Sequence, residues 1–272
     1  MQLKKTIVAL AFMLVAGAAA FADEAYDVVK KFTELDVPEY SKATMLLEIK
    51  NKNGAVETRE MIEYGSGFNV LKNVVFDIQK DSTSKYKGVR VLQAEKTNKE
   101  DDRWIYEPSL RNVRRIQTGE RSGSFVGCEF TYNDMTIRKV DEDKHEMLNA
   151  NDSINVNGTN YTCWQIKSVP IKKNDIEYGY RICWYDKKTY LPVKMEYYDK
   201  KDPKLLMKTF IIEKIDNVKG ITGTPYVLRR SCLITNHITG RTTRVTVKDF
   251  VFDNEKLVNK KIFTTNWLMT GK

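Results

Sequence analysis

Hydrophobic and polar residues alternate along most of the chain after Pro38. Met45, Leu47 and Ile49 are each separated by one residue, and the same spacing recurs in Val74–Ile78 and Val193–Tyr197. A period of two residues is typical of a β-strand that buries one face and exposes the other. Strands of this kind are expected at 45–49, 74–78, 87–94, 103–106, 154–156, 161–168, 177–185, 193–197, 205–212, 228–235 and 241–250.

Turn-forming residues separate several of these runs. Asn51–Gly54 follows the first run, Asn157–Gly158 stands between 154–156 and Tyr161–Ile166, and Asn236–Gly240 divides the last two runs. Asn-Gly between two alternating segments is the strongest short-range signal for a β-hairpin. The chain after Pro38 is therefore expected to be an antiparallel β-sheet or barrel of about ten strands.

Two segments have a different pattern. Tyr26, Val29 and Phe32 recur at helical spacing, which predicts a helix over Asp23–Leu35. Asn133–Asn151 is charged and lacks alternation, and it is expected to form a helix and a loop over the sheet. Two short helical segments cannot cover ten strands, so the uncovered apolar side is expected to form a ligand cavity.

The N-terminus has the pattern of a secretory signal. Lys4 and Lys5 precede the uncharged stretch Thr6–Ala19, and Ala20–Ala22 matches an A-x-A cleavage site. Cleavage after Ala22 is expected to leave residues 23–272 as one soluble, exported domain, periplasmic in a bacterium; the alternative is an uncleaved anchor. A lipid anchor is not expected because the first cysteine is Cys128.

The composition and the motifs limit the kinds of reaction and ligand that the protein is expected to have. A hydrophobic share of 42% and a charged share of 30% are typical of a globular protein, with a net charge of +9. The two histidines, His145 and His237, exclude a His-rich metal site, and G-x-S-x-G, H-E-x-x-H and P-loop motifs do not occur. We therefore expect neither catalysis nor a metal or other cofactor. Nucleic acid is not an expected partner because the chain carries an export signal and no recognition motif.

Four cysteines in an exported chain could form two disulfides. If residue 168 pairs with about 178 in a hairpin, Cys163 lies opposite Cys183 on one face, and a bridge between them is expected. Two free thiols on neighbouring strands are the alternative. No pairing of Cys128 or Cys232 is assigned.

Several longer motifs occur in a characteristic order. Arg103–Ile116 is followed by Ser122–Tyr132, Tyr190–Asp199, Thr235–Thr243 and the closing run from Phe263 to Leu268. Together they resemble the outer-membrane lipoprotein-sorting family, the LolA-like periplasmic carriers, over most of residues 25–268. The resemblance implies a curved, half-open antiparallel β-barrel of about ten or eleven strands with a short helical lid. It also implies a carrier for acyl chains of lipoproteins or free lipid, exchanging cargo with an inner-membrane donor or outer-membrane acceptor.

Two residue sets are candidates for such a site. Aromatic and branched residues on predicted strands could line the cavity or could equally be ordinary core: Trp104, Tyr106, Phe125, Trp164, Ile166, Ile182 and Trp184. Arginines near the first motif could contact a lipid headgroup or a partner protein, or simply lie at a solvated strand edge or turn: Arg111, Arg114, Arg115 and Arg121. A periplasmic sensor of the same fold that binds an envelope-stress regulator is the alternative function, and a lipid-modifying enzyme is the third.

Overall fold

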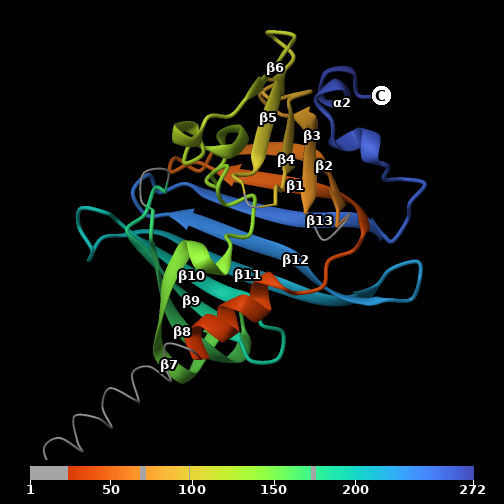
Figure 1. Ribbon diagram of the computed structural model, residues 1–272. Coiled ribbons are helices and arrows are strands. Elements are labelled where there is room, and N and C mark those ends of the chain that lie inside the picture. Colours follow the sequence, from red (N-terminus) through yellow and green to blue (C-terminus); the bar gives the residue numbers. More distant parts are fainter. Residues whose placement is uncertain (1–23, 68–71, 98, 173–175) are drawn as a thin grey trace, which may run out of the picture. The chain divides into compact units, whose positions relative to one another are not determined.

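A computed structural model describes the protein over residues 24–67, 72–97, 99–172 and 176–272. Thirteen strands make up most of these residues, in the hydrogen-bonded order β6-β5-β4-β3-β2-β1-β13-β12-β11-β10-β9-β8-β7 (Figure 1). Within the described residues β6 and β7 stand at the two ends of this order, so the sheet is open. The prediction of a mainly β, antiparallel, half-open fold is confirmed, with thirteen strands in place of ten or eleven. The expected export signal, residues 1–22, lies outside the described residues.

The chain divides into two compact units. The first contains residues 24–35 and Ile137–Thr209, and the second contains Asp36–Thr136 and Phe210–Lys272. Most of β11 (Leu206–Lys219) belongs to the second unit. The single domain expected from the sequence stays a prediction, and each unit is described separately below.

The first unit combines one helix with four strands. The helix covers residues 24–33, within the predicted range, and is called the N-terminal helix. The turn before β8 has φ of 50° at Asn157 and 84° at Gly158, the left-handed conformation that a two-residue hairpin turn requires. This confirms the hairpin predicted from Asn-Gly. The strands are β7 (Asp143–Val156), β8 (Thr159–Pro170), β9 (Tyr180–Asp186) and β10 (Pro192–Tyr198).

The second unit holds the remaining strands and a short C-terminal helix. Trp267 and Leu268 of α2 (Thr265–Thr270) pack on Val75 and Leu92 of the sheet. The Thr264 hydroxyl accepts a hydrogen bond from the Trp267 amide and caps the helix start. The strands are β1 (Tyr40–Lys50), β2 (Val56–Ser66), β3 (Asn73–Asp81), β4 (Arg90–Ala94), β5 (Asp102–Glu107), β6 (Asn112–Arg115), β12 (Pro225–Asn236) and β13 (Thr242–Phe252), and the 3₁₀ turns are η2 (Thr118–Glu120), η3 (Phe125–Gly127) and η5 (Lys260–Phe263).

The helix expected within Asn133–Asn151 is wrong. Only the 3₁₀ turn η4 (Val140–Glu142) is helical there, and β7 begins at Asp143. Of the strands that the structure describes, β7 pairs with β8 alone, and its pairing register shifts between Met147 and Asn149 and again before Asp152. These irregularities interrupt the period of two, and an edge strand carries polar side chains, so the sequence pattern does not indicate a strand there.

Candidate functional site

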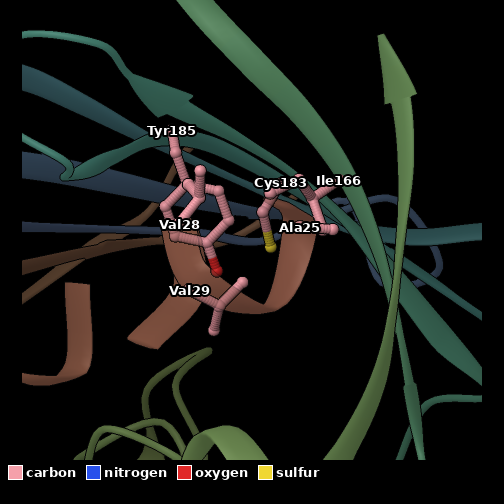
Figure 2. Close-up of a cluster of buried hydrophobic side chains, with 6 residues drawn as sticks. All are labelled: Ala25, Val28, Val29, Ile166, Cys183 and Tyr185. Carbon is pink, nitrogen blue, oxygen red and sulfur yellow. The ribbon is translucent and has the colours of Figure 1, made fainter. Parts of the chain in front are cut away.

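The N-terminal helix covers an apolar face of the sheet in the first unit. Ala25, Val28 and Val29 of the helix pack against side chains of β8 and β9 (Figure 2). All six side chains of this cluster are at most 4% exposed. The sheet contributes Ile166, Cys183 and Tyr185. We call these six residues the helix-covered cluster.

Strand register explains why these side chains share a face. Ile166 pairs with Met147 of β7 on one side and with Cys183 of β9 on the other, and Cys183 pairs with Met195 of β10. Side chains of directly paired residues point to the same face of a sheet. The four strands therefore present a continuous apolar row of Met147, Ile166, Cys183 and Met195, with both methionines packed at the margin of the helix-covered cluster.

The polar contacts between the helix and other described residues lie at its exposed margin. The Tyr26 hydroxyl donates to Asp141 Oδ1 at 2.9 Å, and Lys31 Nζ donates to the Tyr190 hydroxyl at 3.3 Å. Exposed contacts of this kind contribute little stability each. The helix is therefore held mainly by hydrophobic contacts, which are of the kind that a hydrocarbon chain can also make.

A polar row lies beside the apolar row, two residues further along each strand. It consists of His145, Ser168, Arg181 and Tyr197, which pair directly across β7, β8, β9 and β10. His145 Nδ1 lies 2.9 Å from Ser168 Oγ, and His145 Nε2 lies 2.9 Å from the Val140 carbonyl oxygen. A carbonyl oxygen only accepts, so Nε2 of the neutral ring donates to it and Nδ1 accepts from the serine hydroxyl.

The serine of this pair is buried and the histidine is partly buried. Ser168 is fully buried, and burial lowers the pKa of His145, opposed by the Val140 carbonyl and Asp143. The Tyr26 ring of the N-terminal helix lies edge-on to the His145 ring, with 6.4 Å between the ring centres. The pair therefore joins β7 to β8 beneath the helix, and the expectation of no catalysis stays a prediction.

Asp143 completes the polar row. Its carboxylate accepts from Arg138 Nη2 at 2.7 Å and from Arg181 Nη2 at 3.1 Å. The Asp143 side chain is 1% exposed and both arginine side chains are 14% exposed. One buried carboxylate is thus shared by two largely buried guanidinium groups.

The residues proposed to line a cavity do not gather at one place. Trp164 and Ile166 belong to the face under the N-terminal helix. Ile182 and Trp184 alternate with Cys183 and so point to the opposite face, where the Trp184 indole donates to Asp152 at 2.8 Å. In the second unit, Trp104 and Tyr106 pack near α2, whereas Phe125 contacts the rings of Phe76 and Tyr132.

The predicted Cys163–Cys183 register is wrong by three residues. Cys163 pairs with Asp186 and Ser168 pairs with Arg181, so Cys183 lies opposite Ile166. An odd shift moves a side chain to the other face of the sheet. The two cysteines therefore point to opposite faces, and both are free thiols, as are Cys128 and Cys232.

Three of the four candidate arginines are bound to acidic partners in the second unit. Arg114 forms ion pairs with Glu107 and Glu120 at 3.3 and 3.0 Å, and Arg115 with Asp102 at 2.8 Å. Arg121 is 6% exposed, donates to the Asp101 carbonyl oxygen at 3.0 Å and lies 3.7 Å from Glu100. Arg111 is exposed in the β5–β6 turn with φ of 47°. Their contact with a headgroup or partner stays a prediction.

Sequence reasoning named Ile166 of the apolar row and missed most of the other residues around it. Met147, Asp143 and Arg138 fall in the segment that is expected to be helical, and Arg181 is not among the candidate residues. One signal was available: His145 and Met147 alternate with Lys144 and Glu146. Interpreting that short alternation as a strand would have brought Met147 and His145 to one face.

Two kinds of feature are absent from the described residues. No helix among them is long and apolar enough to cross a membrane. No group of three or more histidine, cysteine, aspartate and glutamate side chains within the same residues is arranged to hold a metal ion.

Comparison with solved structures gives strong likenesses in fold. A DUF1329 family protein from Desulfovibrio piger matches with a TM-score of 0.78 and 21% identity, over 91% of this chain and 99% of that one. A domain from Vibrio parahaemolyticus, described as that of an outer membrane lipoprotein-sorting protein, matches with a TM-score of 0.77 and 25% identity. The match covers 91% of this chain and 99% of that chain. A LolA superfamily protein from Nitrosomonas europaea matches with a TM-score of 0.60 and 16% identity, over 89% of this chain and 98% of that chain.

Sequence comparison adds one match. None of the curated proteins matches the chain. A protein-family model described as "-like: Uncharacterized protein" matches residues 75–270. Because this match takes in well over half of the chain, the protein belongs to the family so described, and its solved structural neighbours include lipoprotein-sorting and LolA superfamily proteins.

Proposed function

We propose that the protein is an exported, periplasmic carrier that binds the acyl chains of lipoproteins or free lipid on the face beneath the N-terminal helix. The observation that carries this proposal is the likeness to the lipoprotein-sorting domain from Vibrio parahaemolyticus, which extends over 91% of this chain and 99% of that one. The export pattern of residues 1–22 supports the proposed location.

The proposed mechanism is displacement of the helix by cargo. An acyl chain takes the place of Val28 and Val29 on Ile166 and Cys183 when the helix moves away. Each buried CH₂ contributes about 0.8 kcal/mol, so about ten of them supply roughly 8 kcal/mol before the costs of ordering the chain and of uncovering the apolar face of the helix. The acyl chain thereby replaces the apolar side chains of the helix. Transfer to an acceptor then follows the difference between the cargo's affinities for the carrier and for the acceptor, and no catalytic group is needed.

Native mass spectrometry of protein purified from its own cell envelope tests the proposal. We expect a bound lipid mass that organic extraction removes, and reversible uptake of a fluorescent fatty acid by the extracted protein. Protein that carries no lipid and takes up none would contradict a carrier role.

Two near-isosteric substitutions then test the location of the site. Met147→Gln and Met195→Gln each replace an apolar side chain at the margin of the helix-covered cluster. We expect each to weaken uptake several-fold, because about 1 kcal/mol of hydrophobic contact is lost. Met269→Gln is the matched control, since Met269 is 49% exposed in α2. Equal effects of all three substitutions would place the cargo elsewhere.

A further inference from the structure

Two basic side chains at the edge of the helix-covered cluster are not matched by the carboxylates around them. Arg138 and Arg181 both bind Asp143, at 2.7 and 3.1 Å. Arg138 also lies 3.8 Å from Glu142, but that side chain is 47% exposed. Among the described residues, the buried ion pairs of this cluster therefore join two positive charges to one negative charge.

Arg59, one of the buried arginines of the second unit, has the opposite balance of charge. Arg59 is 1% exposed and is bound by two carboxylates, Glu57 at 2.8 Å and Asp81 at 3.3 Å. A buried charge is costly unless opposite charge and hydrogen bonds compensate it. The cluster around Asp143 has the opposite ratio, so it retains capacity for an anion.

Arg181 also retains an unused donor. Its Nε is buried and donates to no acceptor among the described residues, which is also true of Arg59 Nε, so the ratio of charges is what distinguishes Arg181 from Arg59. An arginine remains protonated in a protein, so this N–H group is always present. Burial of a donor without an acceptor carries an energetic cost, which a bound oxyanion would relieve.

The position of Arg181 relative to the apolar row indicates what kind of anion fits. Arg181 and Cys183 are two residues apart on β9 and point to the same face, as do Ser168 and Ile166 on β8. The polar row therefore begins about 7 Å from the apolar row, the spacing of two residues along a strand. A ligand with a hydrocarbon chain and a charged end would place the chain on the apolar row and the end beside Arg181.

We infer that Arg181 and Arg138 form a subsite for the anionic end of the cargo, a single carboxylate or phosphate joined to a hydrocarbon chain. The subsite rests on the proposed function, because the acyl chain must first occupy the face beneath the N-terminal helix. The anion accepts from Arg181 Nε, and Asp143 keeps the two guanidinium groups in place. Tyr26, which contacts His145 of the polar row, moves away together with the helix.

Competition against a fluorescent fatty acid, with three ligands of the same chain length, tests this inference on the full-length protein. Oleate carries a carboxylate, 1-oleoyl-lysophosphatidate carries a phosphate, and oleyl alcohol carries no charge. We expect at least one anion to bind about tenfold more tightly than the alcohol, the ratio typical of a hydrogen bond to a charged group. Preference for oleate assigns the subsite to a carboxylate, and preference for lysophosphatidate assigns it to a phosphate.

Substitutions at the two arginines then locate the preference. Arg181→Gln should remove most of the tenfold difference while binding of oleyl alcohol is unchanged, and Arg138→Gln should reduce it. Lys167→Gln is the matched control, because Lys167 precedes Ser168 on β8 and points to the opposite face. If either arginine variant fails to fold, the comparison of ligands on the wild-type protein still decides the question.

The outcomes separate the subsite from the carrier role. Equal binding of all three ligands to the wild-type protein overturns the anionic subsite and leaves the acyl site standing. Retention of the full anion preference in Arg181→Gln also overturns the subsite. Failure of all three ligands to bind overturns the proposed function and the subsite with it.

Discussion

Arg241 and Glu129 form a 2.7 Å ion pair in the second unit that joins two motifs far apart in the sequence. Glu129 belongs to the segment 122–132, and Arg241 to the segment 235–243. The same carboxylate accepts from Asn236 Nδ2 at 2.6 Å, and Arg241 also donates to the Gly127 carbonyl oxygen. Two segments that were singled out for their resemblance to a family are thus held together by side chains within those motifs.

Loss of Arg241 should therefore destabilise the second unit. Arg241→Ala leaves the Glu129 side chain, which is 5% exposed, without its cationic partner, and we expect a loss of about 3 kcal/mol in the free energy of unfolding. Arg244→Ala is the control, since Arg244 is 44% exposed in its pair with Glu213 and should cost less than about 1 kcal/mol. Urea denaturation measures the free energy of unfolding of both variants. Similar losses would show that the buried pair with Glu129 contributes no more stability than the exposed pair with Glu213.

The β7–β8 turn should tolerate alanine poorly at its glycine. Gly158 has φ of +84°, so Gly158→Ala places a side chain in the left-handed region and should cost about 1 kcal/mol. Gly119 has no left-handed φ, and no atom lies within 4 Å of the position that an alanine methyl group would occupy there, so Gly119→Ala should be neutral or slightly stabilising. Thermal melting of both variants tests the turn. A Gly158→Ala protein as stable as wild type would contradict the turn conformation.

Local signals were sufficient for most strands. Turn residues such as Asn157–Gly158 and Asn236–Gly240 fix hairpins within a few positions, and these were predicted correctly. β2 was missed because charged Arg59 and Glu63 pair with apolar Leu47 and Ala43, which hides the alternation. β6 was missed because it has only four residues, Asn112–Arg115, none of them buried.

The candidate site depended on long-range register, which the sequence does not carry. Trp164 and Ile166 were proposed for an apolar face, and they do lie under the N-terminal helix. The three-residue error between β8 and β9 nevertheless placed Trp184 beside them and Cys183 opposite Cys163. Register across a long connection is set by packing of the buried face rather than by turn chemistry. The rows under the helix could therefore be assembled only from the structure.

All four cysteines should be free and slow to react in the folded protein. Burial raises the pKa of Cys128 and Cys163 to about 12 and that of Cys232 to about 11, and it also raises the pKa of Cys183. At pH 8 a thiol with a pKa near 12 is about one part in ten thousand thiolate, the reactive form.

Mass spectrometry after treatment with iodoacetamide checks this prediction. We expect little alkylation of the native protein at pH 8 and four additions after denaturation without a reducing agent. Only two additions to the denatured protein, rising to four after reduction, would reveal a disulfide and contradict the free thiols at Cys163 and Cys183.

Acidification should weaken the first unit through His145. Burial lowers its pKa in the folded protein, whereas the unfolded chain has the ordinary value of about 6.5. As the pH falls below about 6.5, the unfolded chain binds the proton first, so the stability that the neutral histidine provides is lost as the pH falls toward the folded-state pKa. Arg138 and Arg181 favour the neutral ring, and Asp143 and the Val140 carbonyl oppose them.

A pair of variants isolates this contribution from that of the carboxylates. His145→Gln can still hydrogen-bond but does not titrate, so its free energy of unfolding should fall less than that of the wild type between pH 7.5 and pH 5. Lys144→Gln changes the exposed neighbour of His145 and should follow the wild type. Urea denaturation at both pH values gives the comparison. A parallel decline of wild type and His145→Gln would mean that protonation of His145 does not oppose folding, and would contradict a neutral, partly buried ring beside Tyr26.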